Sequence, residues 1–197
     1  MGEKTLTKEI TEIRWHGRGG QGVKTAALLL AEVALADGQY SQGFPDYGPE
    51  RMGAPIRGYT RVSNSPVRMH CAIENPDAVV VLDHTLLGVV DVDAGLKEGG
   101  VILVNSKESP SEIAKRHGLE KFKVMTVDAT GISLDEIGRA IPNTPMVGAL
   151  LKALPVVPVK TLVENMRKEF AKKFSEKIIE GNVKAVERAY QEVASDE

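Results

Sequence analysis

The sequence predicts an α/β fold on a mostly parallel sheet, and three observations support this. A short strand candidate runs into the glycine-rich turn at residues 17–22 (GRGGQG), and an alanine-rich helical stretch follows at once. Residues 78–82 (AVVVL) and 101–104 (VILV) are continuous apolar runs, typical of parallel strands covered on both faces. After Pro142, apolar residues recur at helical spacing. We therefore expect one domain over residues 1–197, with an N-terminal tail (1–11) and a helical C-terminal part (143–197).

The first half of the chain predicts the opening of a βαβ unit. We expect a strand at residues 12–16, a helix at 20–37 ended by Gly38, and a second strand at 40–44. The Gly/Pro-rich stretch 44–58 is expected to be irregular. Residues 59–62 and 66–73 flank a Ser-Asn-Ser turn and predict a β-hairpin insertion, because apolar residues alternate with others in the second arm at Val67, Met69, Cys71 and Ile73.

The second half predicts another strand and several helices. Residues 123–127 form a third apolar run. The sequences SPSE (109–112) and SLDE (133–136) each match a capping box, which predicts two short helices. Helices are also expected at residues 146–154 and 178–193, with a further helix between them whose apolar face carries Val159, Leu162, Val163, Met166 and Phe170.

Composition excludes some classes of protein. The formal net charge of -2 gives no overall positive charge for binding nucleic acid or an anionic membrane. The longest apolar run, residues 26–36, contains Glu32 and is too short to span a bilayer. The first ten residues contain no apolar core of a secretory signal. We therefore expect a cytoplasmic protein.

Cys71 is the single cysteine of the chain. One thiol forms no internal disulfide, and it cannot complete the four-cysteine shell of an iron–sulfur cluster or a structural zinc site. Any such cofactor is expected on another chain. The four histidines show no metal-ligand spacing and are interpreted as structural: His16, His70, His84 and His117.

The glycine turn matches G-x-G-x-x-G between a strand and a helix, which is the context of a dinucleotide-binding fingerprint. Its glycines would let a pyrophosphate approach the backbone amides of the helix N-terminus. An NAD site also needs an acidic residue at the end of the second strand. Asp37 falls before that strand and Asp46 falls in the following loop, which weakens this interpretation.

Two other interpretations of the turn remain open. Lys24 and Thr25 give it a near-match to a phosphate-binding P-loop, but Val23 moves the lysine one residue along the helix and so turns it away from the cradle. Alternatively, the glycines serve only a tight turn and close packing of helix against strand.

Three separated motifs carry a family resemblance. GRGGQGVKTAA (17–27), QGFPDYGPERMGAPIRGYTRVS (42–63) and PNTPMVGAL (142–150) resemble the gamma subunit of pyruvate:ferredoxin oxidoreductase (pyruvate synthase) and its 2-oxoacid relatives. The resemblance covers residues 12–193. It implies a Rossmann-like, doubly wound domain that packs against thiamine-binding subunits and is associated with coenzyme A rather than NAD.

The resemblance also implies a function for the whole complex. Such an enzyme oxidatively decarboxylates pyruvate or a related 2-oxoacid on thiamine diphosphate, reduces ferredoxin through [4Fe-4S] clusters, and releases acyl-coenzyme A. Thiamine diphosphate, its magnesium ion and the clusters would belong to partner subunits, which are of the alpha, beta and ferredoxin-like delta types. This chain lacks a G-D-G motif for thiamine diphosphate, so it is expected to be inactive alone and to carry no catalytic residue and no metal ligand.

The candidate contacts to coenzyme A lie in three segments. The turn is expected to offer backbone amides and the Arg18 guanidinium, which would either grip a phosphate or pair with a carboxylate across a subunit interface. The loop after the second strand and the start of the 143–150 segment are expected nearby, although a loop ion pair and a helix cap are the simpler interpretations of these two segments. The full set is Gly17, Arg18, Gly19, Gly20, Gln21, Gly22, Tyr47, Glu50, Arg51, Asn143 and Thr144.

One more candidate residue lies outside this set. Asp83, at the end of an apolar strand, would face the same crevice, but a helix cap is its expected role. The alternatives for the whole chain are a free-standing NAD(P)-dependent oxidoreductase and a plain assembly module whose glycine turn holds no ligand.

Overall fold

The computed structural model describes residues 10–46 and 52–196. A seven-stranded sheet has the order β2-β3-β1-β4-β5-β6-β7. Its strands are β1 (Ile10–Arg18), β2 (Tyr40–Pro45), β3 (Pro55–Ser63), β4 (Ala78–Val81), β5 (Val101–Asn105), β6 (Lys123–Val127) and β7 (Ala194–Ser195). The helices are α1 (Val23–Ala36), α2 (Pro110–His117), α3 (Ala129–Ile137), α4 (Asn143–Ala153), α5 (Val159–Phe170) and α6 (Glu176–Glu192).

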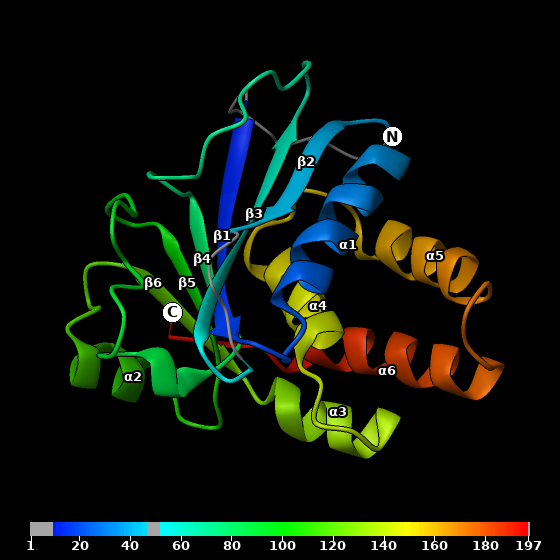
Figure 1. Cartoon of the computed structure of the whole chain (residues 1–197). Helices are drawn as coiled ribbons and strands as arrows, with labels where there is room; N and C mark the ends of the chain where they lie inside the picture. Colours follow the sequence, from blue (N-terminus) through cyan, green and yellow to red (C-terminus); the bar gives the residue numbers. More distant parts are fainter. Residues whose placement is uncertain (1–9, 47–51, 197) are drawn as a thin grey trace.

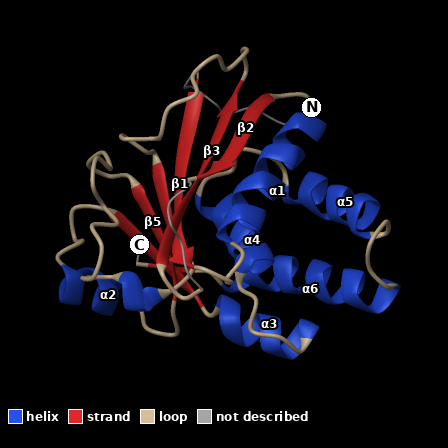
Figure 2. Cartoon of the chain, viewed as in Figure 1, coloured by secondary structure: helices blue, strands red, loops and turns tan. Residues whose placement is uncertain are grey.

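The sheet is wound in two directions from its middle. From β1 the chain passes through α1 to β2 at one edge, whereas β4, β5 and β6 follow one another towards the other edge as parallel neighbours. Helix α2 lies on one face of the sheet, and α1, α4, α5 and α6 lie on the other (Figures 1 and 2). The predicted doubly wound, mostly parallel α/β fold is thereby confirmed.

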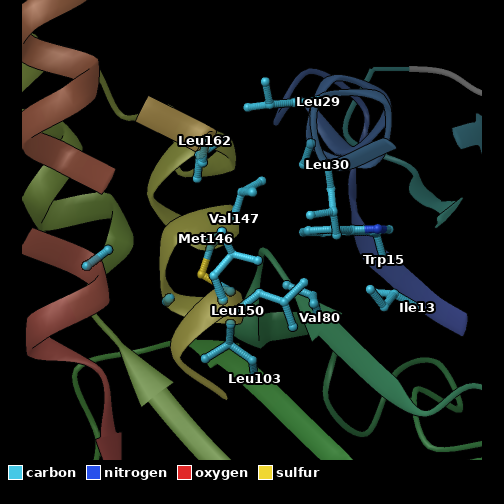
Figure 3. Packing of buried hydrophobic residues seen from close by; sticks show 14 of the residues in the cluster. Ile13, Trp15, Leu29, Leu30, Val80, Leu103, Met146, Val147, Leu150 and Leu162 are labelled. Atoms are coloured by element: carbon cyan, nitrogen blue, oxygen red, sulfur yellow. The ribbon is translucent and has the colours of Figure 1, made fainter. Parts of the chain in front are cut away.

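A large apolar core joins the sheet to the helices of the more heavily covered face. Met146, Val147 and Leu150 of α4 point towards Trp15 of β1 and Leu103 of β5 (Figure 3). All of these side chains are fully buried. The predicted apolar face of α5 packs against the same core, with Leu162 and Met166 buried and Val159, Val163 and Phe170 partly buried. Helix α4 therefore holds its first residue, Asn143, against Gly22 at the start of α1.

The predicted hairpin between residues 59–62 and 66–73 is wrong. Strand β3 instead begins at Pro55, inside the stretch expected to be irregular, and pairs antiparallel with both β1 and β2. Both edges of β3 are thus occupied, so no partner remains for residues 66–73, which run without regular structure. Of the alternating apolar residues only Ile73 is buried, while Met69 and Cys71 are exposed.

The second predicted capping box is also wrong. The first, SPSE, is confirmed: the Ser109 hydroxyl accepts from the amide of Glu112, whose side chain accepts from the amide of Ser109. In SLDE, however, Ser133 lies inside α3, which Asp128 caps by accepting from the amide of Gly131. The Ser133 hydroxyl instead donates to the backbone carbonyl oxygens of Ala129 and Ile141, so this serine bonds to the backbone from within the helix and does not cap it.

Candidate functional site

The carboxyl ends of β1 and β4 meet at the point where the winding direction of the sheet reverses. These two strands are parallel neighbours, with His16 opposite Val81. Helix α1 leaves β1 towards one face, while the 3-10 helix η1 (His84–Leu86) follows β4 and its Leu86 joins the core of the other face. In open α/β sheets, a ligand crevice forms outside the strand ends at such a switch point. The glycine turn lies at this position.

The turn lies later in the chain than the sequence predicts, because β1 extends to Arg18 instead of residue 16 and α1 begins at Val23 instead of residue 20. The amide of Gly19 donates to the carbonyl of Ala54 (2.9 Å), and the amide of Gly53 donates to the carbonyl of Gly19 (3.1 Å). Residues 53 and 54 therefore hold the turn from outside. Gly22 caps α1 without a side chain, and the first three amides of the helix have no acceptor among the described residues.

Two of the fingerprint glycines are required by packing. A Cβ on Gly17 would lie 2.5 Å from Cγ2 of Val23, and one on Gly22 would lie 2.6 Å from Nδ2 of Asn143. Gly22 also has φ of 82°, in the left-handed region. Gly20 differs, because a Cβ there would meet no atom within 4 Å. The packing interpretation thus accounts for Gly17 and Gly22, while the backbone at Gly20 stays open to an approaching group.

Arg18 and Gln21 bind a carboxylate from the neighbouring strand end. Nε of Arg18 lies 3.3 Å from Oδ2 of Asp83, and Nε2 of Gln21 donates to the same oxygen at 2.7 Å. Oε1 of Gln21 accepts from the Arg18 amide at 2.7 Å. The guanidinium also donates to Oγ1 of Thr85 (3.0 Å) and to the carbonyl of Gly53 (3.2 Å). The carboxylate partner of Arg18 therefore lies in its own chain.

The charge of Asp83 is stabilised by this network. Burial alone raises the pKa of its carboxyl, but hydrogen bonds from Thr85 and Gln21 and the charge of Arg18 outweigh burial, and the pKa lies below its ordinary value. Asp83 also caps η1 by accepting from the amide of Thr85 (3.0 Å), as expected from the sequence. The crevice thus carries a fixed pair of opposite charges.

Asn143 is the distant residue that the fold brings to the turn. It is buried as the first residue of α4, and its Oδ1 accepts from the Thr144 amide at 2.9 Å. Pro142 stands at the N-cap position and no side chain caps α4, so the predicted cap by Asn143 or Thr144 is wrong. Nδ2 of Asn143 faces Gly22 and has no acceptor among the described residues. Thr144 points elsewhere, because its hydroxyl donates to Oδ1 of Asn182 on α6 (3.0 Å).

Other predicted residues lie outside this cluster or outside the described residues. Tyr47, Glu50 and Arg51 belong to the part of the chain that the structure does not describe, so their role stays a prediction. Thr85 was missed, although it follows Asp83 by two residues at the same strand end. Lys24 is exposed and lines the groove between α1 and the C-terminal helices, which disfavours the P-loop interpretation.

The geometry also disfavours an NAD site. Asp46 does follow β2, but β3 lies between β1 and β2, which places Asp46 about 10 Å across the sheet from β1. Its Oδ2 already binds Arg57 at 2.8 Å and the hydroxyl of Tyr59 at 3.1 Å. A ribose bound at the glycine turn would therefore find no free carboxylate among the described residues where the fingerprint requires one.

The chain's own donor set does not fit the redox cofactors of the predicted complex. In the described ranges, no three side chains of His, Cys, Asp or Glu gather in a way that could hold a metal ion. The whole sequence has one cysteine, and a [4Fe-4S] cluster needs four ligands. No helix in the described part is both long and apolar enough to cross a membrane. No reaction step is therefore assigned to a metal or cluster on this chain.

Together, the fold and the site define a Rossmann-like α/β protein with a glycine turn at its switch point. The chain belongs to the pyruvate ferredoxin/flavodoxin oxidoreductase family, whose model matches residues 12–192. It is 46% identical over 192 residues to the pyruvate synthase subunit PorC of Thermotoga maritima, covering 98% of this chain and 99% of that protein. The resemblance to gamma subunits of this oxidoreductase is thereby confirmed.

A second relative and a crystal structure of T. maritima PorC support the assignment. The pyruvate/ketoisovalerate oxidoreductases common subunit gamma of Thermococcus kodakarensis is 45% identical over 179 residues, covering 91% of this chain and 95% of that protein. The crystal structure of pyruvate oxidoreductase subunit PORC from T. maritima superposes with a TM-score of 0.85 at 44% identity, covering 96% of this chain and all of that one. Both the sequence and the fold are therefore shared over nearly the full length.

Proposed function

We propose that this chain is the gamma subunit of a 2-oxoacid:ferredoxin oxidoreductase that converts pyruvate, or a related 2-oxoacid, to acyl-coenzyme A. The observation that carries the proposal is the full-length similarity to PorC and to the common gamma subunits. In the complex, thiamine diphosphate and [4Fe-4S] clusters on alpha-, beta- and delta-type partners supply the decarboxylation and electron-transfer chemistry, and ferredoxin takes the electrons. This chain packs on the thiamine-binding subunits and contributes by binding and shielding, without carrying out a chemical step itself.

Its contribution is to hold coenzyme A and to keep water from the reacting centre. The free amides at the start of α1 and the positive end of the helix dipole favour a phosphate at the switch point. Gly20 leaves space for that phosphate, and Nδ2 of Asn143 adds a side-chain donor beside Gly22. A ligand held by several fixed donors is already oriented before it reacts, which lowers the entropic part of the barrier.

Arg18 is the charged member of this binding surface. Its hydrogen bonds to Gly53 and Thr85 and its pairing with Asp83 use three of the five N–H donors of a guanidinium. Two N–H groups are left for a phosphate, and 30% of the side chain is exposed. Asp83 and Thr85 therefore act as positioning residues, which hold the guanidinium at the mouth of the crevice without touching the substrate.

The test uses the assembled complex carrying Arg18→Ala. We expect the KM for coenzyme A to rise about tenfold, as for the loss of one charged hydrogen bond, while the KM for the 2-oxoacid stays the same. Arg116→Ala is the matched control, because Arg116 also pairs with a carboxylate, Glu108, but lies on α2. An unchanged KM for coenzyme A would remove the role of Arg18. Failure of the wild-type chain to purify with thiamine- and cluster-bearing subunits would overturn the function itself.

A further inference from the structure

A groove of about 1100 Å³ lies on the helical face, and it reaches the start of α1, where Lys24, Thr25 and Asn143 line it. Its walls come from α1, α3, α5 and α6 and from the corner between α5 and α6, and Asn143 and Thr144 of α4 lie at its base. We call it the helical groove. In Figure 1, α1, α5 and α6 lie on the side of the sheet opposite α2.

Apolar side chains line the helical groove and are open to solvent. Leu35 of α1 is 63% exposed, Phe174 in the corner is 46% exposed, and Ile178 of α6 is 41% exposed. Phe170 stacks edge-on against Phe174, with ring centroids 5.4 Å apart, so the corner presents a rigid aromatic surface. Contiguous exposed apolar surface of this kind on a globular protein marks an interaction site.

The charges around the helical groove are unbalanced. Lys24, Arg139, Lys173 and Lys177 form no ion pair with any described residue. The acidic side chains differ, because Arg188 pairs with Glu136 (2.8 Å) and Lys172 pairs with Glu169 (2.7 Å). Among the described groove residues, only Glu32 remains as an unpaired anion. The rim is therefore net positive and complements an acidic partner.

A buried polar atom in the wall also lacks a partner. Oδ1 of Asn165, on α5, is excluded from solvent and accepts no hydrogen bond from the described residues. A buried carbonyl oxygen without a donor costs free energy, and a donor brought by another molecule removes that cost. The helical groove thus combines exposed apolar side chains, a cationic rim and a wall acceptor without a donor among the described residues.

We propose that the helical groove receives an amphipathic helix from a partner subunit of the complex, with one apolar face and carboxylates on its flanks. An amphipathic helix binds a groove by laying its apolar face against apolar side chains of the walls, and the helical groove offers such side chains. The volume exceeds that of a typical small-ligand pocket, and the four cations lie on several different elements rather than around one point. A long acidic segment matches this spread of charge better than a single anionic group. The inference rests on the proposed function for the partner's place in the complex.

The experiment measures assembly of the full chain with its co-expressed partner subunits. Two double variants are compared with wild type: Phe174→Asp/Ile178→Asp removes the apolar corner, and Lys173→Glu/Lys177→Glu reverses the rim charge. All four side chains are exposed, so folding is retained and is checked by circular dichroism. The matched control, Lys115→Glu/Lys123→Glu, makes the same charge change on the side of α2 and β6.

We expect both groove variants to weaken assembly at least tenfold, while the control assembles as the wild type does. Raised salt should weaken the wild-type complex and have less effect on the Lys173→Glu/Lys177→Glu variant. Hydrogen exchange of wild type should slow at residues 170–178 on assembly. Equal assembly of wild type and groove variants would overturn the inference and leave the proposed function intact, whereas a wild-type chain that joins no partner would refute the proposed function.

One further outcome would also overturn the inference. If the isolated wild-type chain forms a dimer in sedimentation experiments and Phe174→Asp/Ile178→Asp abolishes it, the occupant of the helical groove is a second copy of this chain. Wild type that stays monomeric alone and assembles through the groove only with its partners supports the inference.

Discussion

The two halves of the sheet are held together by different forces. In the parallel half, β4, β5 and β6 are lined mainly by aliphatic side chains that pack against helices or loops on both faces. In the antiparallel half, β1 and β3 bury charged and polar side chains among apolar ones, namely Thr11, Arg14, His16, Thr60, Arg61 and Ser63. The first half is stabilised by apolar packing, whereas the second also uses hydrogen bonds from buried cations to the backbone.

Those cations hold the irregular segments beside the sheet. Nη2 of Arg14 donates to the carbonyls of Ala94 (2.6 Å) and Val92 (3.0 Å). Arg61 pairs with Glu12 (2.8 Å) and donates to the carbonyl of Cys71 (2.9 Å). Carbonyl oxygens of an irregular segment have no partner strand and need other hydrogen-bond donors. Here the buried guanidinium groups supply those donors. The comparison shows that buried arginines in β1 and β3 hold neighbouring loops by hydrogen bonds, in addition to the apolar packing of the core.

The largest expected effect is in the parallel half. Leu103→Ala leaves a cavity between β5 and α4, and we expect the free energy of unfolding to fall by about 3–5 kcal/mol in urea titrations. The loss should be global, with one cooperative transition, because Leu103 belongs to the main core. The control Leu134→Ala, at a position 51% exposed, should change stability by less than about 0.5 kcal/mol. Equal losses in the two variants would contradict a core held by apolar packing.

A smaller and more local effect is expected in the antiparallel half. Arg14→Met leaves buried carbonyls without their donor, and we expect a loss of about 2–3 kcal/mol. Hydrogen exchange should accelerate at residues 73–77 and 92–96 before the rest of the domain. Arg57→Met is the control, because Arg57 is exposed and its ion pair with Asp46 is worth less than about 1 kcal/mol. If the two segments exchange no faster in Arg14→Met, the hydrogen bonds of Arg14 do not hold these segments against the sheet.

The same contrast explains which elements the sequence could predict. The strands at 78–81, 101–105 and 123–127 are mainly apolar and follow one another in the sheet in chain order, so the local pattern predicts them as parallel strands. The 66–73 segment alternates as a strand does, yet β2 already occupies the free edge of β3. Competition between strands for one edge is a property of the whole sheet, and a local pattern does not contain it.

The candidate site was predictable to a similar extent. A glycine-rich turn between strand and helix indicates a switch-point loop, and the turn is found at that position. The contacts of Arg18 with Asp83 and of Gly22 with Asn143 join residues more than 60 positions apart in the sequence. Only the order of the strands brings these residues together. The sequence suggested Asp83 as a cap, but its pairing with Arg18 required knowledge that β1 and β4 are neighbours.

The smallest expected effect depends on pH and isolates one buried side chain of the antiparallel half. His16 is 3% exposed, and its Nε2 accepts from Nε of Arg14 at 3.0 Å, which requires an unprotonated nitrogen. Burial first, and then the charges of Arg14 and Arg57, lower the pKa of His16 to about 3. The unfolded chain, with an ordinary histidine pKa near 6.5, therefore binds a proton that the folded chain rejects at intermediate pH.

Because the unfolded state binds more protons, stability must fall as the pH decreases below about 6.5. We expect the free energy of unfolding to drop by about 2 kcal/mol between pH 6.5 and 5, at about 1.4 kcal/mol per pH unit. Most carboxylates titrate at lower pH, so this window reports mainly on histidine. His16→Gln should flatten the dependence, while His70→Gln, at an exposed position in the irregular segment, should keep it. An unchanged slope in His16→Gln would show that His16 is protonated in the fold and that Arg14 binds the loops without it.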